Sequence, residues 1–396
     1  MTQGIPDPVF ERMVTLRRDL HQHPELSWSE HRTMDRIAQE LVALGLSPHT
    51  GVAGTGIVVD LPGRAGGPRI ALRADTDALP VQEETALPFA SVHDGVMHAC
   101  GHDGHTSMLV GAAELLLADP PPGPVRLLWQ PAEETGRGAP AMIEAGALQG
   151  VAAIFGGHLD RHYPPGVLVV SEGPVNASTD TFRICFRGQQ GHGARPHESI
   201  DAVVVGSLFV TSLQTIVSRE VDPAKPSVIT VGRFDAGTAS NVIAGSALLE
   251  GTIRAQHRSV RDHLYASIER IAGAIGQLHG ARVDVEVTEG TPPLINEVRP
   301  AVLARQAAID VVGADRVQEL HTANMGGEDF AWYLEEVPGA YIRYGAQVPG
   351  RESFPAHSGG FDIHEDALAV GARWLDRVAR LAGERLALDP GLLTRP

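Results

Sequence analysis

The sequence predicts a mainly parallel α/β fold that is interrupted by a second, α+β domain. Before Ser178, short apolar runs bounded by Gly, Pro or Asp alternate with helical segments, an order typical of a parallel sheet flanked by helices. After Ser178 the order becomes strand, helix, two strands, helix and strand, which is typical of a ferredoxin-like module. A length of 396 residues also favours two domains over one. We therefore expect one domain over residues 1–177 and 291–396, with the second inserted as residues 178–290.

Two helices followed by buried strands are expected at the start of the chain. Apolar residues at helical spacing predict the first helix over residues 8–21. Ser27-x-x-Glu30 resembles a capping box that opens the second helix, which should end near Gly45. Continuous apolar runs then predict buried strands. These elements are strands over residues 56–61, 69–73, 125–129 and 151–155, with a helix over residues 105–117.

The inserted domain and the end of the chain are read in the same way. Alternating apolar and polar residues over 181–186 predict a half-buried strand. The other elements expected in the insertion are strands over 227–234, 247–254 and 282–287 and helices over 201–219 and 263–278. After Pro292-Pro293 the first domain resumes, with a strand over 340–344 and a closing helix over about 365–382.

The composition excludes several classes of function. The net charge of -16 opposes binding to nucleic acid or to anionic membranes, because both require a basic surface. Lys225 is the only lysine and lies between two prolines, which excludes lysine Schiff-base chemistry and a P-loop. The only cysteines, Cys100 and Cys185, are far apart and offer no disulfide framework. The first residues lack the features of a secretory signal, so we expect a cytoplasmic protein.

Side chains that can bind a metal or move a proton follow directly after the predicted strands. Ligands bind at these strand ends in open α/β sheets, so the placement indicates one common site. The residues are Asp75 and Asp77 after one strand, Cys100, His102, Asp103 and His105 in a later loop, Glu133 and Glu134 after the next strand, and His158 after the last.

The run from Cys100 to His105 is the strongest of these candidates. A thiolate and imidazoles suit zinc, manganese, cobalt or nickel, and the glycines allow a tight turn around an ion. A polar turn with a buried free cysteine explains the same run. Glu133-Glu134 could divide into a metal ligand and a general base, although paired glutamates are more often a solvated surface.

Three further segments are ambiguous when taken singly. His192 and His357 lie on glycine-rich stretches that are equally compatible with surface turns, and His158 alone is compatible with an ordinary buried histidine. The segment from Met325 to Phe330 offers two acids, which a helix N-terminus would also explain.

Taken together, these motifs resemble the co-catalytic dinuclear metallopeptidase superfamily of aminoacylase and glutamate carboxypeptidase, in its amidohydrolase branch of hippurate hydrolase and indole-acetyl-amino acid hydrolase. The resemblance spans nearly the whole chain. It rests on the segments 17–26, 73–80, 97–106, 130–134, 241–243 and 325–330. It implies a zinc-peptidase-like catalytic domain and an inserted domain that acts as a lid and dimerisation module.

The resemblance also implies roles for particular residues. Glu133 becomes the general base, and Asp75 orients or tunes a ligand. His192 stabilises the developing oxyanion from the partner subunit, and Asn241 and Arg254 help to hold the substrate, for whose carboxylate a guanidinium is suited. The implied ligands of two divalent ions, Zn, Mn, Co or Ni, are Cys100, His102, Glu134, His158 and His357. Asp103 is then a local support.

The predicted function is metal-dependent hydrolysis of the amide bond of N-acyl amino acids, a small-molecule substrate, by a homodimer or higher homo-oligomer. Two departures from the family pattern, at Leu159-Asp160 and Ser358-Gly359, indicate a different pocket wall and leave the acyl group open. A dipeptidase or carboxypeptidase, an N-acetyl-amino acid deacetylase, and a metal-loaded binding protein without turnover are the alternatives.

Overall fold

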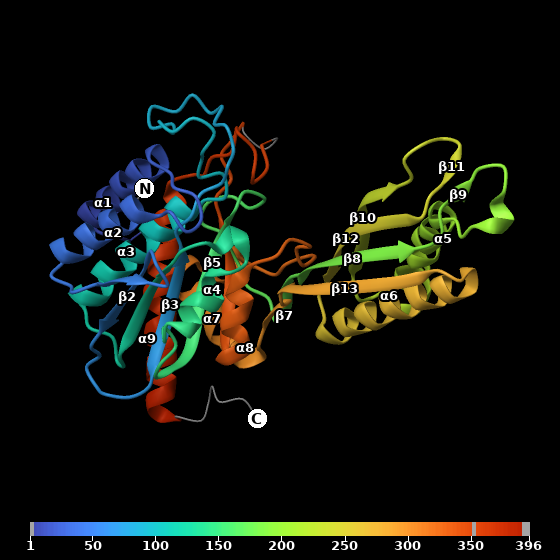
Figure 1. Cartoon of the computed structure of the whole chain (residues 1–396). Coiled ribbons are helices and arrows are strands. Elements are labelled where there is room, and N and C mark those ends of the chain that lie inside the picture. Colours follow the sequence, from blue (N-terminus) through green and yellow to red (C-terminus); the bar gives the residue numbers. More distant parts are fainter. Residues whose placement is uncertain (1–3, 351–353, 390–396) are drawn as a thin grey trace. The chain divides into compact units, whose positions relative to one another are not determined.

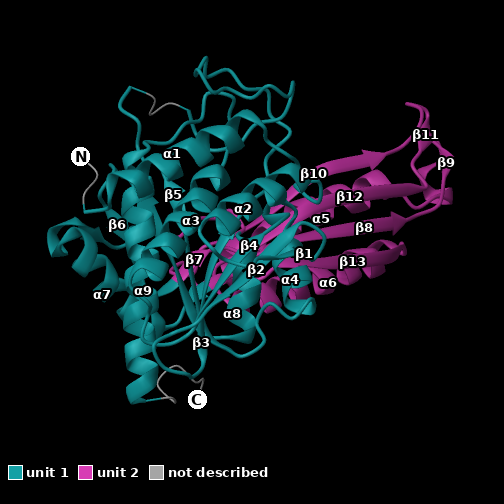
Figure 2. Cartoon of the chain, turned by 90° about the vertical axis from the view of Figure 1, so that its left-hand side faces the viewer, with its two compact units in different colours: residues 1–173, 295–322, 328–396 teal, residues 174–294, 323–327 magenta. Residues whose placement is uncertain are grey.

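The computed structural model describes residues 4–350 and 354–389 and divides the chain into two compact units. Figure 1 labels the helices and strands of the chain, of which unit 1 comprises residues 1–173, 295–322 and 328–396. Unit 2 comprises residues 174–294 and 323–327 (Figure 2). Each unit has its own cluster of buried apolar side chains, which is why each forms a compact body.

Unit 1 is built on an eight-stranded sheet. Its strands are β1 (His49–Val52), β2 (Gly56–Leu61), β3 (Arg69–Asp75), β4 (Val125–Gln130), β5 (Val151–Asp160), β6 (Leu168–Val169), β15 (Val317–Gln318) and β16 (Gly339–Gly345). They are ordered β1-β2-β4-β3-β5-β16-β6-β15, and the central strands β4, β3, β5 and β16 are parallel. Every residue of β4 and β16 is buried, which explains their continuous apolar runs. The prediction of a mainly parallel α/β fold is confirmed.

Helices cover this sheet. They are α1 (Asp7–Gln22), α2 (His31–Ala43), α3 (His102–Ala118), α4 (Gly138–Glu144), α7 (Val298–Val312), α8 (Tyr333–Glu336) and α9 (Asp366–Leu388). Short 3₁₀ turns cover Glu133–Thr135, Ala314–Arg316 and Asp329–Trp332. Helices α3 and α9 pack against β3 and against each other, α1 packs on α3, and α7 packs on α9.

Two glycines allow the closest helix contacts. A Cβ atom at Gly111 of α3 would lie 2.2 Å from Sδ of Met13 on α1. A Cβ atom at Gly371 of α9 would likewise lie 2.2 Å from Sδ of Met108 on α3. Both distances are far inside van der Waals contact, so any larger residue would force these methionine side chains to move.

The entry into α2 differs from the predicted capping box, which is wrong. The Ser27 hydroxyl donates to Asp77, and the Glu30 carboxylate accepts from the Thr55 hydroxyl and from the backbone of Ala132. The first turn of α2 is instead capped by Glu25, whose carboxylate accepts from the backbone N–H groups of residues 32 and 33. The two side chains of the motif are thus used for long-range contacts, which outcompete the local cap.

Unit 2 has the predicted α+β order. Its main strands are β8 (Thr179–Arg187), β10 (Ser227–Ala236), β12 (Ser246–Ala255) and β13 (Arg282–Thr291). Its helices are α5 (Ala202–Thr215) and α6 (Arg258–His279), with a π turn over Ile216–Glu220 and a 3₁₀ turn over Pro196–Glu198. Four short strands complete the chain: β7 (Gly173–Asn176), β9 (Gly191–His192), β11 (Val242–Ile243) and β14 (Leu294–Asn296).

The main sheet of unit 2 is antiparallel, in the order β10-β12-β8-β13, and α5 and α6 pack against it. Phe182, Phe186 and Phe209 fill the core between the sheet and the helices. The stretch Ala202–Glu220 is long and apolar enough to cross a membrane by length and composition alone, and 33% of its most apolar window is buried. Part of its apolar surface therefore faces out of unit 2.

The Trp374→Ala substitution should strongly destabilise unit 1. Trp374 on α9 is fully buried, and its indole N–H donates to the Ala304 carbonyl at 3.0 Å. The centre of its ring lies 5.7 Å from the centre of the Tyr344 ring. Truncation of a buried tryptophan costs about 3–5 kcal/mol. Denaturant unfolding followed by circular dichroism measures the loss. The control is Leu388→Ala on the same helix, where the side chain is 81% exposed and no comparable change is expected. Equal effects of the two variants would contradict the packing described.

Candidate metal centre

The structure brings six predicted side chains of unit 1 together near the carboxyl ends of the central strands. Cys100 and His102 lie on either side of Gly101 at the start of α3, Glu133 and Glu134 form the turn after β4, and His158 lies near the end of β5. The sixth, His357, lies on the loop before α9. These residues fall into overlapping groups of three whose ligand atoms lie within 4.8 Å of one another.

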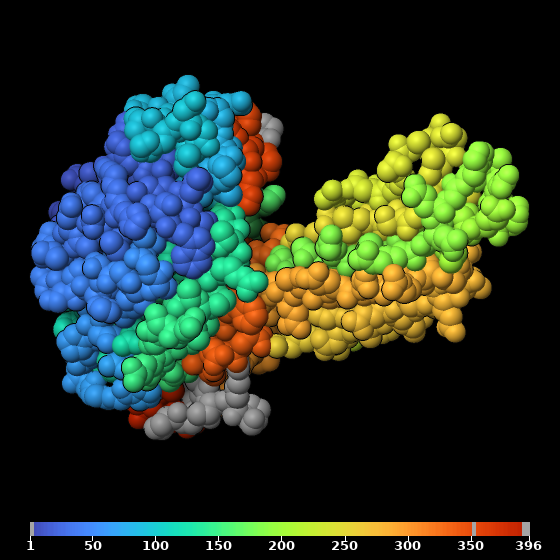
Figure 3. Space-filling model, in the orientation of Figure 1, coloured from blue at the N-terminus to red at the C-terminus, as the bar shows by residue number. Residues whose placement is uncertain are grey.

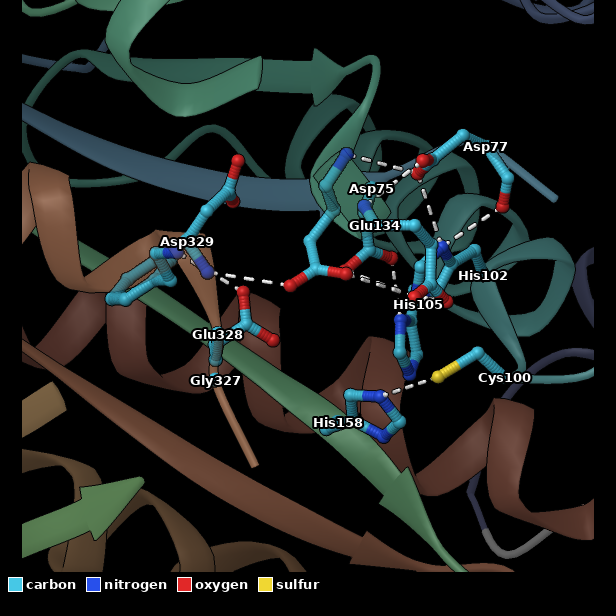
Figure 4. Close-up of polar contacts among 12 residues, drawn as sticks. Asp75, Asp77, Cys100, His102, His105, Glu134, His158, Gly327, Glu328 and Asp329 are labelled. Carbon is cyan, nitrogen blue, oxygen red and sulfur yellow. Dashed lines mark hydrogen bonds and ion pairs between the residues drawn. The ribbon is translucent and has the colours of Figure 1, made fainter. Parts of the chain in front are cut away.

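Direct contacts join the members of this cluster. The Sγ atom of Cys100 lies 3.3 Å from Nε2 of His158 (Figure 4). Nε2 of His102 lies 3.9 Å from Oε1 of Glu134, and the same oxygen lies 3.5 Å from Nε2 of His357. A thiol, three imidazoles and a carboxylate therefore point at one small volume.

The backbone takes unusual conformations where it delivers these ligands. Gly101 has a φ of 99° and ends the loop that turns into α3. His357 has a φ of 66°, which is strained for a residue with a side chain. The two ligand-bearing loops are joined directly, because the His357 backbone N–H donates to the Ala99 carbonyl at 2.8 Å.

Two buried polar atoms in the cluster have no hydrogen-bond partner among the described residues. They are Nε2 of His102 and Oε1 of Glu134, the two atoms that face each other. Burying such atoms without a partner costs free energy, so they are rarely left unpaired in a stable protein. A divalent cation would satisfy both, and the thiol and imidazole donors suit a borderline-soft metal. The residues present therefore fit a metal centre.

Asp77 supports the ligands, a role that the sequence analysis did not assign to it. Its carboxylate accepts from the backbone N–H groups of Glu133 at 3.1 Å and Glu134 at 3.0 Å. It also accepts from the Ser27 hydroxyl at 2.7 Å. Nδ1 of His102 lies 2.9 Å from the backbone carbonyl of Asp77 and 3.3 Å from its carboxylate. Asp77 thus fixes the acidic turn through its carboxylate and the imidazole mainly through its carbonyl. The only signal in the sequence was a second acid in the run after β3.

Asp75 lies beside the cluster but contacts a different histidine. Its Oδ1 is 2.6 Å from Nδ1 of His105, whereas its Oδ2 is 3.8 Å from Nε2 of His102. Nε2 of His105 accepts from the backbone N–H of Leu159 at 2.8 Å, and its ring lies 4.7 Å from that of His158. Asp75 and His105 therefore hold the end of β5 that carries His158. The sequence motif alone does not indicate this supporting role for His105.

A second polar network surrounds Glu133. The backbone N–H of Asp329 donates to Oε1 of Glu133 at 3.3 Å. The buried guanidinium of Arg73 contacts Asp329 at 2.8 Å, Glu328 at 3.2 Å and Asp75 at 2.6 Å. The acids of the 325–330 segment are thus tied to the glutamate and to the sheet, which explains that motif better than a helix cap alone.

Burial and mutual repulsion raise the proton affinity of the acidic groups. Burial raises the pKa of Glu133 well above its usual value, and the charges of Glu328 and Glu134 raise it further. Burial likewise raises the pKa of Glu134 to about 7 and, with the charge of Glu134, raises the pKa of the Cys100 thiol. Burial and the charge of His105 lower the pKa of His158, which favours the neutral imidazole that metals bind. A bound cation would reverse the shifts on the acids.

The remaining candidates lie in unit 2. His192 on β9 is exposed, and its Nδ1 accepts from the backbone N–H of Ala194 at 3.0 Å. Asn241 precedes β11, which pairs with β9, and its carbonyl accepts from Gly193 at 2.9 Å, so the structure places His192 and Asn241 side by side. Arg254 on β12 donates to the Met325 carbonyl at 3.5 Å.

Comparisons with known proteins agree on one family for this chain. Residues 71–381 match the description of peptidase family M20/M25/M40. The chain is 38% identical over 382 residues to the N-acetylcysteine deacetylase of Bacillus subtilis, which covers 95% of this chain and 98% of that protein. It is also 38% identical over 370 residues to thermostable carboxypeptidase 1 of Saccharolobus solfataricus, which covers 91% of this chain and 92% of that protein.

A solved structure agrees with the sequence relatives. The YXEP protein of Bacillus subtilis, described as a dinuclear metal binding peptidase from the M20 family, superposes with a TM-score of 0.85 at 35% identity. The match covers 96% of this chain and 99% of that one. The fold, the cluster at the strand ends and these relatives define a hydrolase that acts on amide bonds. The chain belongs to peptidase family M20/M25/M40, which confirms the resemblance and the expectation of an enzyme.

Removal of the Asp77 carboxylate should weaken metal binding. In Asp77→Ala the acidic turn loses its acceptor and His102 loses a neighbouring negative charge, although Nδ1 of His102 keeps its bond to the backbone carbonyl of residue 77. Loss of such supporting groups lowers metal affinity or activity by roughly 10–100-fold. Chelator competition with zinc or manganese measures the affinity. Ser27→Ala, which removes only one donor to Asp77, is the matched control and should have a smaller effect. An Asp77→Ala protein with unchanged metal affinity would show that this support is dispensable.

Proposed function

We propose that this enzyme hydrolyses the amide bond of N-acyl amino acids with the help of two divalent metal ions. The proposal is carried by the cluster in unit 1, where two unpartnered buried atoms and a soft donor set converge. The proposed ligands are Cys100, His102, Glu134, His158 and His357. Zn, Mn, Co and Ni all suit these donors. The description of the YXEP protein as dinuclear supports a count of two.

Glu133 is the proposed general base. Bound in the cluster, two divalent ions would lower the pKa of a water molecule and polarise the scissile carbonyl. With the ions bound, the Glu133 carboxylate would accept a proton from this water and then donate it to the leaving amine. The N–H of Asp329 holds the carboxylate in place through one oxygen and leaves the other for the reaction. Asp75, through its bond to His105, keeps the His158 strand end in position.

Three residues of unit 2 complete the proposal. His192 is exposed on its loop and can donate a hydrogen bond to the oxyanion that develops on the carbonyl. Arg254 has a guanidinium, which suits the free carboxylate of an amino acid. Its hydrogen bond to the Met325 carbonyl is long, at 3.5 Å, so a substrate carboxylate could replace that carbonyl as a stronger partner. Asn241, beside His192, offers a side-chain amide for the substrate.

An N-acetyl-amino acid deacetylase is the second candidate for the acyl specificity. It is favoured by the 38% identity to the N-acetylcysteine deacetylase of Bacillus subtilis, whereas the resemblance of the sequence motifs predicts an activity similar to that of hippurate hydrolase. The similarity to thermostable carboxypeptidase 1 leaves peptides as a third candidate class of substrate. We also propose a cytoplasmic location, because a free Cys100 thiol that serves as a ligand must stay reduced.

Glu133→Gln tests the reaction and a substrate panel tests its specificity. The variant should keep both metal ions, measured by elemental analysis, while kcat falls by roughly 10²–10⁴-fold, because only the proton acceptor is lost.

Wild-type protein loaded with zinc, manganese or cobalt is assayed on N-acetyl and N-benzoyl amino acids and on dipeptides. Hydrolysis of an N-acyl amino acid above the dipeptides supports the proposal. Near-normal turnover by a metal-loaded Glu133→Gln would exclude this base, and cleavage of dipeptides alone would exclude the substrate class.

We further propose that unit 2 mediates a homodimer in which His192 acts on the partner's cluster. Val203, Val204 and Leu208 expose apolar surface on one side of α5, at 42%, 45% and 39%. Strand β10 lies at the edge of its sheet, next to β12 alone. Exposed apolar surface and a free strand edge are both features that association covers.

Subunit mixing tests this arrangement. Mixed Glu133→Gln and His192→Ala chains should regain a measurable part of the activity, because hybrid dimers contain a site with both groups intact. Each variant alone is the control. In addition, Leu208→Glu should shift the mass measured by light scattering to that of a monomer, whereas Leu278→Glu on α6, which is 74% exposed in wild type, should not. Verified subunit exchange without any recovered activity would exclude catalysis across the dimer.

A further inference from the structure

The N-terminal motif around Arg17 and His21 has no place in the proposed reaction, yet it includes a fully buried arginine. Arg17 lies on α1 with its side chain 1% exposed. Its guanidinium contacts three carboxylates: Asp103 at 3.0 Å, Asp362 at 2.9 Å and Glu365 at 3.4 Å. These partners come from two segments that are far apart in the sequence.

The first segment carries Cys100 and His102. Asp103 lies in the first turn of α3, directly after His102. Its Oδ2 accepts from Nε of Arg17 and also lies 2.8 Å from Nδ1 of His21, which is one turn further along α1. Helix α1 therefore holds the start of α3 through two side chains on one face.

The second segment carries His357. Asp362 and Glu365 lie between His357 and α9, and Glu365 also pairs with Arg18 at 2.7 Å. The strained backbone of His357 persists only if its surroundings fix it. The same loop is bound on its other side, where the backbone N–H of Glu84 donates to the Gly359 carbonyl at 2.7 Å. In the space-filling view, residues of the 80–95 loop lie beside this segment at one end of unit 1 (Figure 3).

We propose that Arg17 is a positioning residue that couples the two ligand-bearing segments, so that the ligands on either side of the centre are held at a fixed separation. The proposal rests on the metal ligands proposed above. The guanidinium is suited to this task because its three nitrogens lie in one rigid plane and each reaches a different carboxylate. A lysine offers one compact head group and can replace only part of these contacts.

Metal affinity of Arg17 variants tests the coupling, and Arg12 supplies a matched control. Arg12 lies on the same helix and also forms two ion pairs, with Glu40 at 2.7 Å and Glu114 at 3.0 Å, but neither partner adjoins a proposed ligand. Arg17→Met should lower the affinity for zinc or manganese by roughly 10–100-fold, the usual effect of removing a group that orients ligands. Arg17→Lys should lose less metal affinity than Arg17→Met, and Arg12→Met should bind the metal as tightly as wild type.

The readouts are chelator competition and the rise in Tm that each metal produces in folded protein, so the result does not depend on turnover. Equal metal affinity of folded Arg17→Met and Arg12→Met overturns the proposal. If Arg17→Met does not fold, Asp362→Asn decides, because it removes one arm of the same contact; wild-type affinity in that variant overturns the coupling. His102→Ala distinguishes failure of the Arg17 coupling from failure of the proposed metal-ligand set. If it binds metal as tightly as wild type, the proposed ligand set itself has failed.

Discussion

The buried carboxylates at the strand ends of unit 1 are the constraint on which the rest of the unit depends. Asp75, Asp77, Glu328 and Asp329 are all at most 3% exposed, and the two glutamates of the turn after β4 lie among them. Negative charges this close in a medium of low polarity repel one another strongly. Each must therefore be matched by a donor, a proton or a cation. The fold supplies the donors, and the raised pKa values of Glu133 and Glu134 mark where the match is incomplete.

Two buried arginines supply positive charge to different groups of these carboxylates. Arg73 neutralises the acids on the side of Glu133 and ties Asp75 to the 325–330 segment. Arg17 neutralises the acids on the other side and ties the start of α3 to the segment after His357. Asp77 lies between these networks and holds the acidic turn by two backbone N–H groups. The buried atoms that lack a hydrogen-bond partner among the described residues include Nε2 of His102 and Oε1 of Glu134, which belong to proposed metal ligands. A cation between these two ligands would supply the missing partner.

Unit 2 is organised by a different principle. Its sheet and two helices enclose a separate core of aromatic and aliphatic side chains, and none of the candidate metal-binding groups found among the described residues lies there. Its polar candidates, His192 and Asn241, are exposed at the small antiparallel two-stranded sheet of β9 and β11 instead of being fixed in a core. Exposed side chains on a loop suit contact with a substrate or another subunit, whereas a metal centre requires the rigid edge of a sheet.

The sequence by itself determined the kind of fold and the identity of the proposed ligands. Continuous apolar runs predicted β2, β3, β4 and β5, and the polar residues that follow them predicted one common site. Local patterns suffice for the strands and for the candidate side chains, because strand periodicity and residue chemistry are properties of short segments. The choice of the five proposed ligands rests on the resemblance of the whole set of motifs to the family.

Only the tertiary structure decided how these residues are supported. Asp77, His105 and Arg17 act on partners far along the chain, and no local spacing signals such contacts. Ser27 and Glu30 show the reverse case: a local pattern predicted a capping box, but Asp77, Thr55 and Ala132 bind these side chains instead. Long-range hydrogen bonds in a buried site outweigh a solvent-exposed helix cap, and they exist only once the chain has folded.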